Sequence, residues 1–142
     1  MEVAYQSKNK YVLIFEKGED FKETFLEFLK EENIESAFFY GLGGFLSVEI
    51  AFYDLEGEKE YLTKEIEGPF EVANVVGNVS LQEGELSIHN HVTLGRGDYK
   101  SRAGHLVNGI VGGTLEVKLD VLEEGEPLTR EFDEETGLDL LG

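Results

Sequence analysis

The chain has 142 residues, with 12 basic against 30 acidic side chains and a formal net charge of -18 at pH 7. This length suits a single domain over residues 1–142, because a chain of this size buries a core of its own. The charge disfavours duplex DNA as a partner of this chain alone, since a DNA-binding face neutralises phosphates with clustered Lys and Arg.

The composition narrows the chemistry further. The chain contains no cysteine, which excludes disulfides, cysteine-based zinc sites and thiol nucleophiles. No apolar run approaches the length of about 18 residues that marks a transmembrane helix. The first ten residues, MEVAYQSKNK, lack the pattern of a secretion signal. We therefore expect a cytoplasmic protein.

The first predicted elements are a strand and the one convincing helix. The run YVLIF at residues 11–15 is rich in strand-forming residues and ends before Gly18. Asp20 is suited to cap a helix, with Glu23 as its capping-box partner and Asn33 as a stop that tolerates a left-handed conformation. Apolar side chains then recur at helical spacing and predict one buried face: Phe21, Phe25, Phe28 and Leu29.

Strands follow the helix. SAFFYGLGG at 36–44 predicts a short buried strand ending in a glycine turn, and FLSVEIAFYDLEG at 45–57 predicts a second strand with Leu46, Val48, Ile50 and Phe52 on one face. Further strands are expected over 57–68, 69–81, 85–95 and 105–122, with a bend at the glycines near 109–113. An acidic tail, about 123–142, is expected to pack in part on the domain or a neighbour. The total is an α+β fold of about seven strands and one main helix.

All three histidines fall within seventeen consecutive residues. Because side chains alternate along a strand, His89 and His91 in ELSIHNHVTLG share a polar face, opposite the row Leu86, Ile88, Val92 and Leu94. His105 follows the loop GRGDYKSRAG, so a hairpin would bring it beside them. Three imidazoles suit zinc and leave a fourth position open, as in catalytic sites. Ordinary hydrogen bonding by polar-face histidines is the competing interpretation.

Two residues complicate this prediction. Strand parity groups His105 with the apolar row of Val107 and Val111, so either the strand bulges or His105 sits at a strand end where parity matters little. Glu71 lies in a strand that is otherwise apolar. It is either an edge carboxylate facing water or a general base or hydrogen-bond partner for an imidazole.

The order of motifs resembles one known family. FEKGEDF, GLGGF, GPFEVANVVGNVSL, HNHVTLG, GHLVNGIVGGTLEV and REFDEETGL together look like the PPC domain, the plant and prokaryote conserved domain, over about residues 11–141. The resemblance implies a compact α+β domain with a largely antiparallel sheet that assembles as a trimer. It also implies a metal on His89, His91 and His105, as in some prokaryotic members, and matches Glu71 to the family's strand glutamate.

The resemblance has departures. Ala103 replaces the first glycine of the family's Gly-Gly-His-Leu, and Ile14 stands where an arginine is common. No AT-hook is present, so the DNA targeting of plant members does not transfer.

Three hypotheses for the function follow. The first is a homotrimer that binds zinc or another divalent metal, with a small anionic ligand or a metal-activated water and Glu71 as a base. The second is a non-catalytic protein-interaction scaffold, and the third is DNA binding.

Overall fold

The computed structural model describes the whole chain, residues 1–142. It contains one helix and eight strands, which confirms the α+β class with one strand more than expected. The elements are β1 (Glu2–Ser7), β2 (Lys10–Glu16), α1 (Phe21–Glu31), β3 (Ala37–Tyr53), β4 (Tyr61–Gln82), β5 (Glu85–Gly95), β6 (Ser101–Val121), β7 (Thr129–Asp133) and β8 (Leu138–Leu141).

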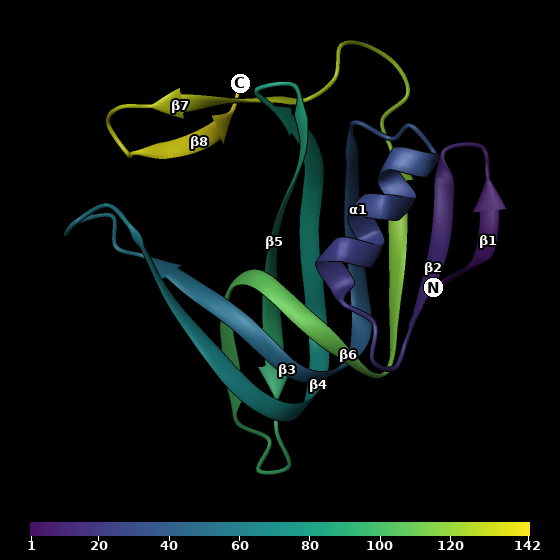
Figure 1. Ribbon diagram of the computed structural model, residues 1–142, viewed down its shortest axis with the longest axis vertical. Coiled ribbons are helices and arrows are strands. Elements are labelled where there is room, and N and C mark those ends of the chain that lie inside the picture. The colour runs from purple at the N-terminus through teal and green to yellow at the C-terminus, as the bar shows by residue number, and fades with distance from the viewer.

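All eight strands join one sheet, in the order β1-β2-β6-β3-β4-β7-β8, with β5 pairing to both β4 and β6. Every pairing is antiparallel except the short contact of β4 with β7, so the largely antiparallel sheet is confirmed. Because β3 and β5 both pair with β4 and β6, the four longest strands close a circuit of backbone pairings. Figure 1 shows these strands bending across the molecule.

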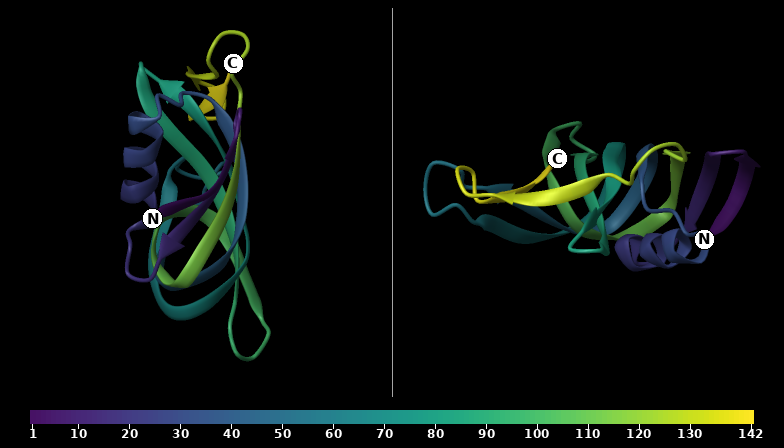
Figure 2. Two further views of the ribbon diagram at one scale, coloured as in Figure 1. Left: turned by 90° about the vertical axis from the view of Figure 1, so that its right-hand side faces the viewer. Right: turned by 90° about the horizontal axis from the view of Figure 1, so that it is seen from above.

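The helix forms and packs as its sequence predicts. The carboxylate of Asp20 accepts a hydrogen bond from the backbone N–H of Glu23 at 2.9 Å, and Asn33 takes a positive φ of 56° just past the helix end. The four predicted apolar side chains are buried. Figure 2 shows α1 lying against one face of the sheet. No helix in the structure has the length and hydrophobicity that a membrane span requires.

Edge-to-face aromatic contacts join the helix to the sheet. The Phe25 ring lies 5.8 Å from that of Phe15 on β2 and 5.1 Å from that of Phe39 on β3. All three side chains are almost fully buried, and each contributes roughly 1.5–3 kcal/mol through removal of apolar surface from water. The core therefore lies between α1 and one face of the sheet, and the histidine strand β5 lies beside it.

The glycines at 41–44 do not form a turn, so that prediction is wrong. β3 runs through them as one strand, and its register against β4 and β6 shifts at Gly41–Gly43 and Gly43–Phe45. A side chain at Gly41 would clash with the carbonyl oxygen of Glu116, because the two backbones approach closely there. The glycines thus let one long strand bend where two strands and a turn were expected.

Bulges also overturn the predicted alternation of β3. Leu46 and Phe52 are exposed, Phe52 to 69%, while Val48 is buried, and the pairing of β3 with both neighbours shifts between Phe45 and Ser47. The two strands predicted over 57–81 are one strand, β4. β6 begins at Ser101, four residues earlier than expected, and its register against β3 shifts near the glycines, as the sequence predicted.

The acidic tail forms a hairpin of β7 and β8 that packs on the sheet. β7 pairs with the end of β4 through Leu81 and Thr129, and the backbone N–H of Leu128 donates to the Ser36 hydroxyl at 2.8 Å. This confirms that part of the tail packs on the domain. Phe132 does not, since 65% of its surface is exposed.

Candidate metal centre

β5 presents its histidines on the side of the sheet that faces away from the core. Val92 and Leu94 are 2% and 1% exposed, which puts the opposite face of the strand in the hydrophobic interior. His89 is half-buried and His91 is exposed. In the register of the sheet, His89 lies opposite Asn78 and His91 opposite Val76, both on β4. The predicted division of this strand into a polar and an apolar face is confirmed.

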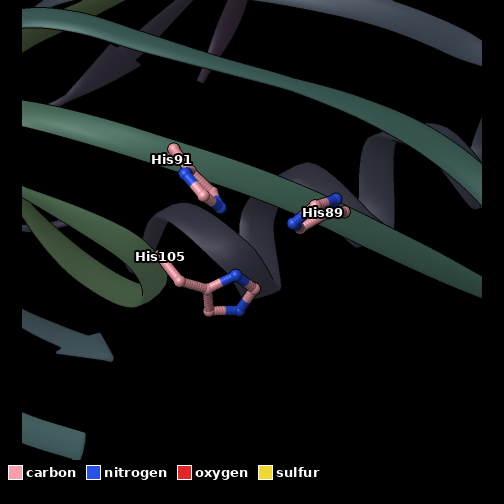
Figure 3. Close-up of side chains that lie close together, drawn as sticks. All are labelled: His89, His91 and His105. Carbon is pink, nitrogen blue, oxygen red and sulfur yellow. The ribbon is translucent and has the colours of Figure 1, made fainter. Parts of the chain in front are cut away.

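The third histidine joins the first two across the next strand pair. His105 on β6 is the direct cross-strand partner of His91, so backbone pairing places the two imidazoles side by side. The ligand nitrogens of the three residues all lie within 4.8 Å of one another. Ring centroids are 5.2 Å apart for His89 and His91, and 5.3 Å for His89 and His105. Figure 3 shows each ring turning one nitrogen toward the space between them.

A bulge in β6 explains why His105 does not lie in the apolar row to which regular strand alternation assigned it. Opposite β3, Glu49 pairs with Asn108 and the next residue, Ile50, pairs with Leu106, so Val107 is the extra residue. The side chains before and after Val107 therefore alternate out of phase. Leu106 points into the core at 2% exposure, and His105 points to the other face.

Burial and neighbouring charges favour the neutral form of two of the imidazoles. Burial, together with His89 and His91, lowers the pKa of His105 from 6.5 to about 4. Burial lowers the pKa of His89 below its ordinary value, and the nearby Arg130 guanidinium lowers this pKa further. The Tyr61 ring packs on His105 with a centroid distance of 4.8 Å and helps bury it. Neutral imidazoles are the form that binds metal ions.

The chemistry of these residues fits a metal ion. Nitrogens bound to one tetrahedral zinc at 2.0–2.1 Å lie about 3.4 Å from one another, so small side-chain rotations bring the three within reach of one ion. The Nδ1 atom of His105 is buried and has no hydrogen-bond partner. An unpartnered buried nitrogen costs free energy, and coordination would supply the missing partner.

A cavity of about 380 Å³ adjoins the cluster. Its walls include His89 and His105, Tyr53 and Tyr61 from β3 and β4, and residues of the C-terminal hairpin, among them Arg130. Arg130 donates to His89 Nδ1 at 3.3 Å. Sequence reasoning missed Arg130; the only available signal was that it is the single basic residue in the acidic tail.

Glu71 is not part of the histidine group. On β4 it pairs with Gly95, whereas the position opposite His89 is Asn78, seven residues further along the strand. Its exposed side chain lines a separate cavity of about 930 Å³, with Phe70 and Arg96. Within one chain the structure therefore does not bring the predicted base to the predicted metal ligands.

Comparison with known proteins identifies the family. The model of the Plants and Prokaryotes Conserved (PCC) domain matches residues 3–123. The chain belongs to the PCC domain family. This is the family, also abbreviated PPC, that the order of sequence motifs resembles. No protein with a curated description matches the sequence significantly.

Solved structures of similar proteins support the assignment. A PPC protein from Pyrococcus horikoshii is 33% identical over 100% of this chain and 97% of its own, with a TM-score of 0.87. A metal-containing protein from Archaeoglobus fulgidus is also 33% identical, over 99% and 98%, with the same TM-score. A Bacteroides thetaiotaomicron protein, provisionally described as DNA-binding, is 27% identical over 97% and 94%, with a TM-score of 0.90.

The match to the PCC model ends before the C-terminal hairpin. Residues 124–142, which include Arg130, lie outside it. The three histidines lie within the PCC domain proper, while the hairpin adds a charged wall to the adjoining cavity.

Proposed function

We propose that this PCC protein binds a divalent metal ion, zinc foremost, through His89, His91 and His105. The observation that carries the proposal is the convergence of three imidazole nitrogens within 4.8 Å, from two paired strands. Three imidazoles with no carboxylate among them suit zinc better than calcium or magnesium, which prefer oxygen. The description of the Archaeoglobus fulgidus relative as metal-containing supports the proposal.

The residues around the cluster suit an open rather than a closed site. When bound, a zinc ion with three protein ligands supplies a Lewis acid for water or a small anion. Tyr61 shields one face of His105, and Arg130 holds His89 from its Nδ1 side. The neighbouring cavity gives a small molecule access to the cluster. A role for Glu71 as base stays a prediction, and it requires the Glu71 carboxylate of a second chain to lie beside the histidines of the first.

Elemental analysis of the purified protein tests the proposal. We expect about one metal ion per chain in the wild type and almost none in a His89→Ala, His91→Ala double variant. The matched control is Ser87→Ala, Thr93→Ala, which alters the two flanking polar residues of β5 and should retain the metal. Substoichiometric metal that is unchanged in the histidine variant would contradict the proposal.

We further propose that the protein assembles as a homotrimer through the outer face, defined as Phe38, Tyr40 and Leu42 of β3 with Val76 of β4. These side chains are 46–56% exposed. Tyr40 lies opposite Val76, which lies opposite His91, so the outer face continues into the histidine cluster. Contiguous exposed apolar side chains of this kind are typical of protein interfaces.

Light scattering coupled to size exclusion tests the assembly. The wild type should have three times the chain mass of 15.9 kDa. Tyr40→Glu, Val76→Glu should lower the mass, because it places charges in the proposed interface. Leu55→Glu is the matched control, since Leu55 is also about half exposed, at 49%, but lies in the β3–β4 loop. Equal masses for all three proteins would refute an interface on this face.

A non-catalytic interaction scaffold is the competing function, and the same outer face favours it. On that hypothesis the partner is another protein, and the histidines are structural or incidental. It predicts that the histidine double variant keeps both its oligomeric state and its partner binding. The metal analysis separates the two, because a scaffold has no requirement for stoichiometric metal.

A further inference from the structure

Arg130 has no acidic partner, although the chain carries 30 acidic side chains. Its guanidinium donates to the Ser80 hydroxyl at 3.0 Å, the Asn78 side-chain oxygen at 2.8 Å and the backbone carbonyl of Asp139 at 2.8 Å. The fourth contact is His89 Nδ1 at 3.3 Å. All four acceptors are uncharged, so this half-buried guanidinium is held in place without a direct ion pair, and the Asp139 carboxylate acts on it only at longer range.

The charges that line the cavity do not neutralise Arg130 by direct contact either. Lys59 and Arg130 are balanced in number by Glu60 and Asp139. Lys59 and Glu60 are exposed, and no carboxylate forms an ion pair with Arg130. A divalent ion on the three imidazoles would add positive charge at the wall formed by His89 and His105. The metal-loaded cavity would therefore favour an anion.

The contact between Arg130 and His89 also couples the two binding events. A guanidinium has only N–H donors, so His89 Nδ1 must present its lone pair to Arg130. Coordination of a metal at Nδ1 occupies that lone pair. Coordination at Nε2 moves the imidazole proton to Nδ1, which then faces the guanidinium as a second donor. Either way, metal binding breaks the contact between Arg130 and His89.

We propose that Arg130 is an anion-binding residue that loses its contact with His89 when a metal binds the three histidines, so that the cavity takes a small oxyanion in the metal-loaded protein. This inference rests on the proposed metal site. A guanidinium has five N–H donors, and three contacts remain after His89 is lost, which leaves two. Two N–H groups are what a carboxylate or phosphate accepts in a bidentate pair. Such an anion would lie in the cavity between the histidine cluster and the C-terminal hairpin.

Cobalt-substituted protein provides the test, because the visible spectrum of Co²⁺ reports changes in its ligands. The protein is titrated with acetate in one arm and inorganic phosphate in the other, which separates the two kinds of oxyanion. We expect saturable spectral changes with at least one of them. Arg130→Gln should raise the dissociation constant for that anion about tenfold or more, which is the loss typical of a charged hydrogen bond. Metal-free wild type, followed by calorimetry, should bind the same anion at least tenfold more weakly.

Controls separate this inference from the metal site itself. Arg102→Gln removes an exposed arginine from β6 and should leave anion binding unchanged. Arg130→Lys keeps a charge without the planar fork and should give an intermediate affinity, which guards against misfolding of the glutamine variant. Full metal loading with equal anion affinity in wild type and Arg130→Gln overturns the role of Arg130 and leaves the metal site standing. Absence of metal binding in the wild type overturns both.

Discussion

His91 and His105 face each other directly across the β5–β6 strand pair. Their ring centroids lie 5.6 Å apart with the planes at 81°. Backbone hydrogen bonds of the sheet set this separation, so no loop has to close to bring the two residues together. Ligands held on paired strands lose little conformational freedom when they bind an ion, which favours binding.

Metal binding should stabilise the fold, because the ion binds the folded protein and not a preformed site in the unfolded chain. At a free zinc concentration one hundred times the dissociation constant, the free energy of unfolding rises by about 2.7 kcal/mol. Differential scanning fluorimetry should show an unfolding midpoint several degrees higher with zinc than with chelator. His105→Ala should show no difference between the two conditions, and an equal shift in that variant would place the metal elsewhere.

The metal-free protein should lose stability as the pH falls from about 6.5 to about 4, in part through His105. Its pKa is lowered to about 4 in the folded chain, mainly by burial, so the unfolded chain binds this proton at higher pH. Protonation in that window therefore favours unfolding. Thermal unfolding of His105→Gln in chelator should depend less on pH across the same range. Identical pH profiles for the two proteins would contradict the burial of a neutral imidazole.

The close approach of β3 to β6 predicts an asymmetry between two glycines. Gly41→Ala should lower the free energy of unfolding by about 1–3 kcal/mol, because the new methyl group would meet the Glu116 backbone and the Val117 side chain. Gly97→Ala has no atom within 4 Å of the added carbon and should stay within about 0.5 kcal/mol of wild type. Urea unfolding measures both, and comparable losses would argue against the packed bend at Gly41.

Duplex DNA should not bind to this chain at physiological salt, whatever the provisional description of some relatives. A net charge of -18 opposes approach to a phosphate backbone, and 12 basic side chains offer few phosphate contacts. A gel-retardation assay with a random duplex at about 150 mM salt should show only free DNA. Nanomolar, salt-sensitive retardation would show that the distribution of charge matters more than its sum.

The helix and the histidine face were predictable from the sequence because both depend on local patterns. Asp20, Asn33 and the spacing of the phenylalanines define α1 without reference to the rest of the chain. Alternation along β5 correctly separated His89 and His91 from the core residues. The expected hairpin brought His105 beside them and the family resemblance supported it, although its own strand parity pointed to the wrong face.

The features that the sequence did not predict depend on contacts between distant segments. A bulge such as the one at Val107 is visible only in the register of two strands, so parity fails beyond it. The contact of Arg130 with His89 spans 41 residues and exists because β7 pairs with the end of β4. The position of Glu71 also depends on register, since it lies on a neighbouring strand but several residues from the histidines.

Anomalous scattering from crystals of the purified protein, recorded above and below the zinc absorption edge, tests the metal site most directly. A difference peak within about 2.0–2.1 Å of one nitrogen on each of His89, His91 and His105 is the predicted result. The contradicting result is sought in crystals grown after supplementation with zinc. A peak elsewhere, or none at the three histidines, would contradict the claim that this PCC protein holds a metal there.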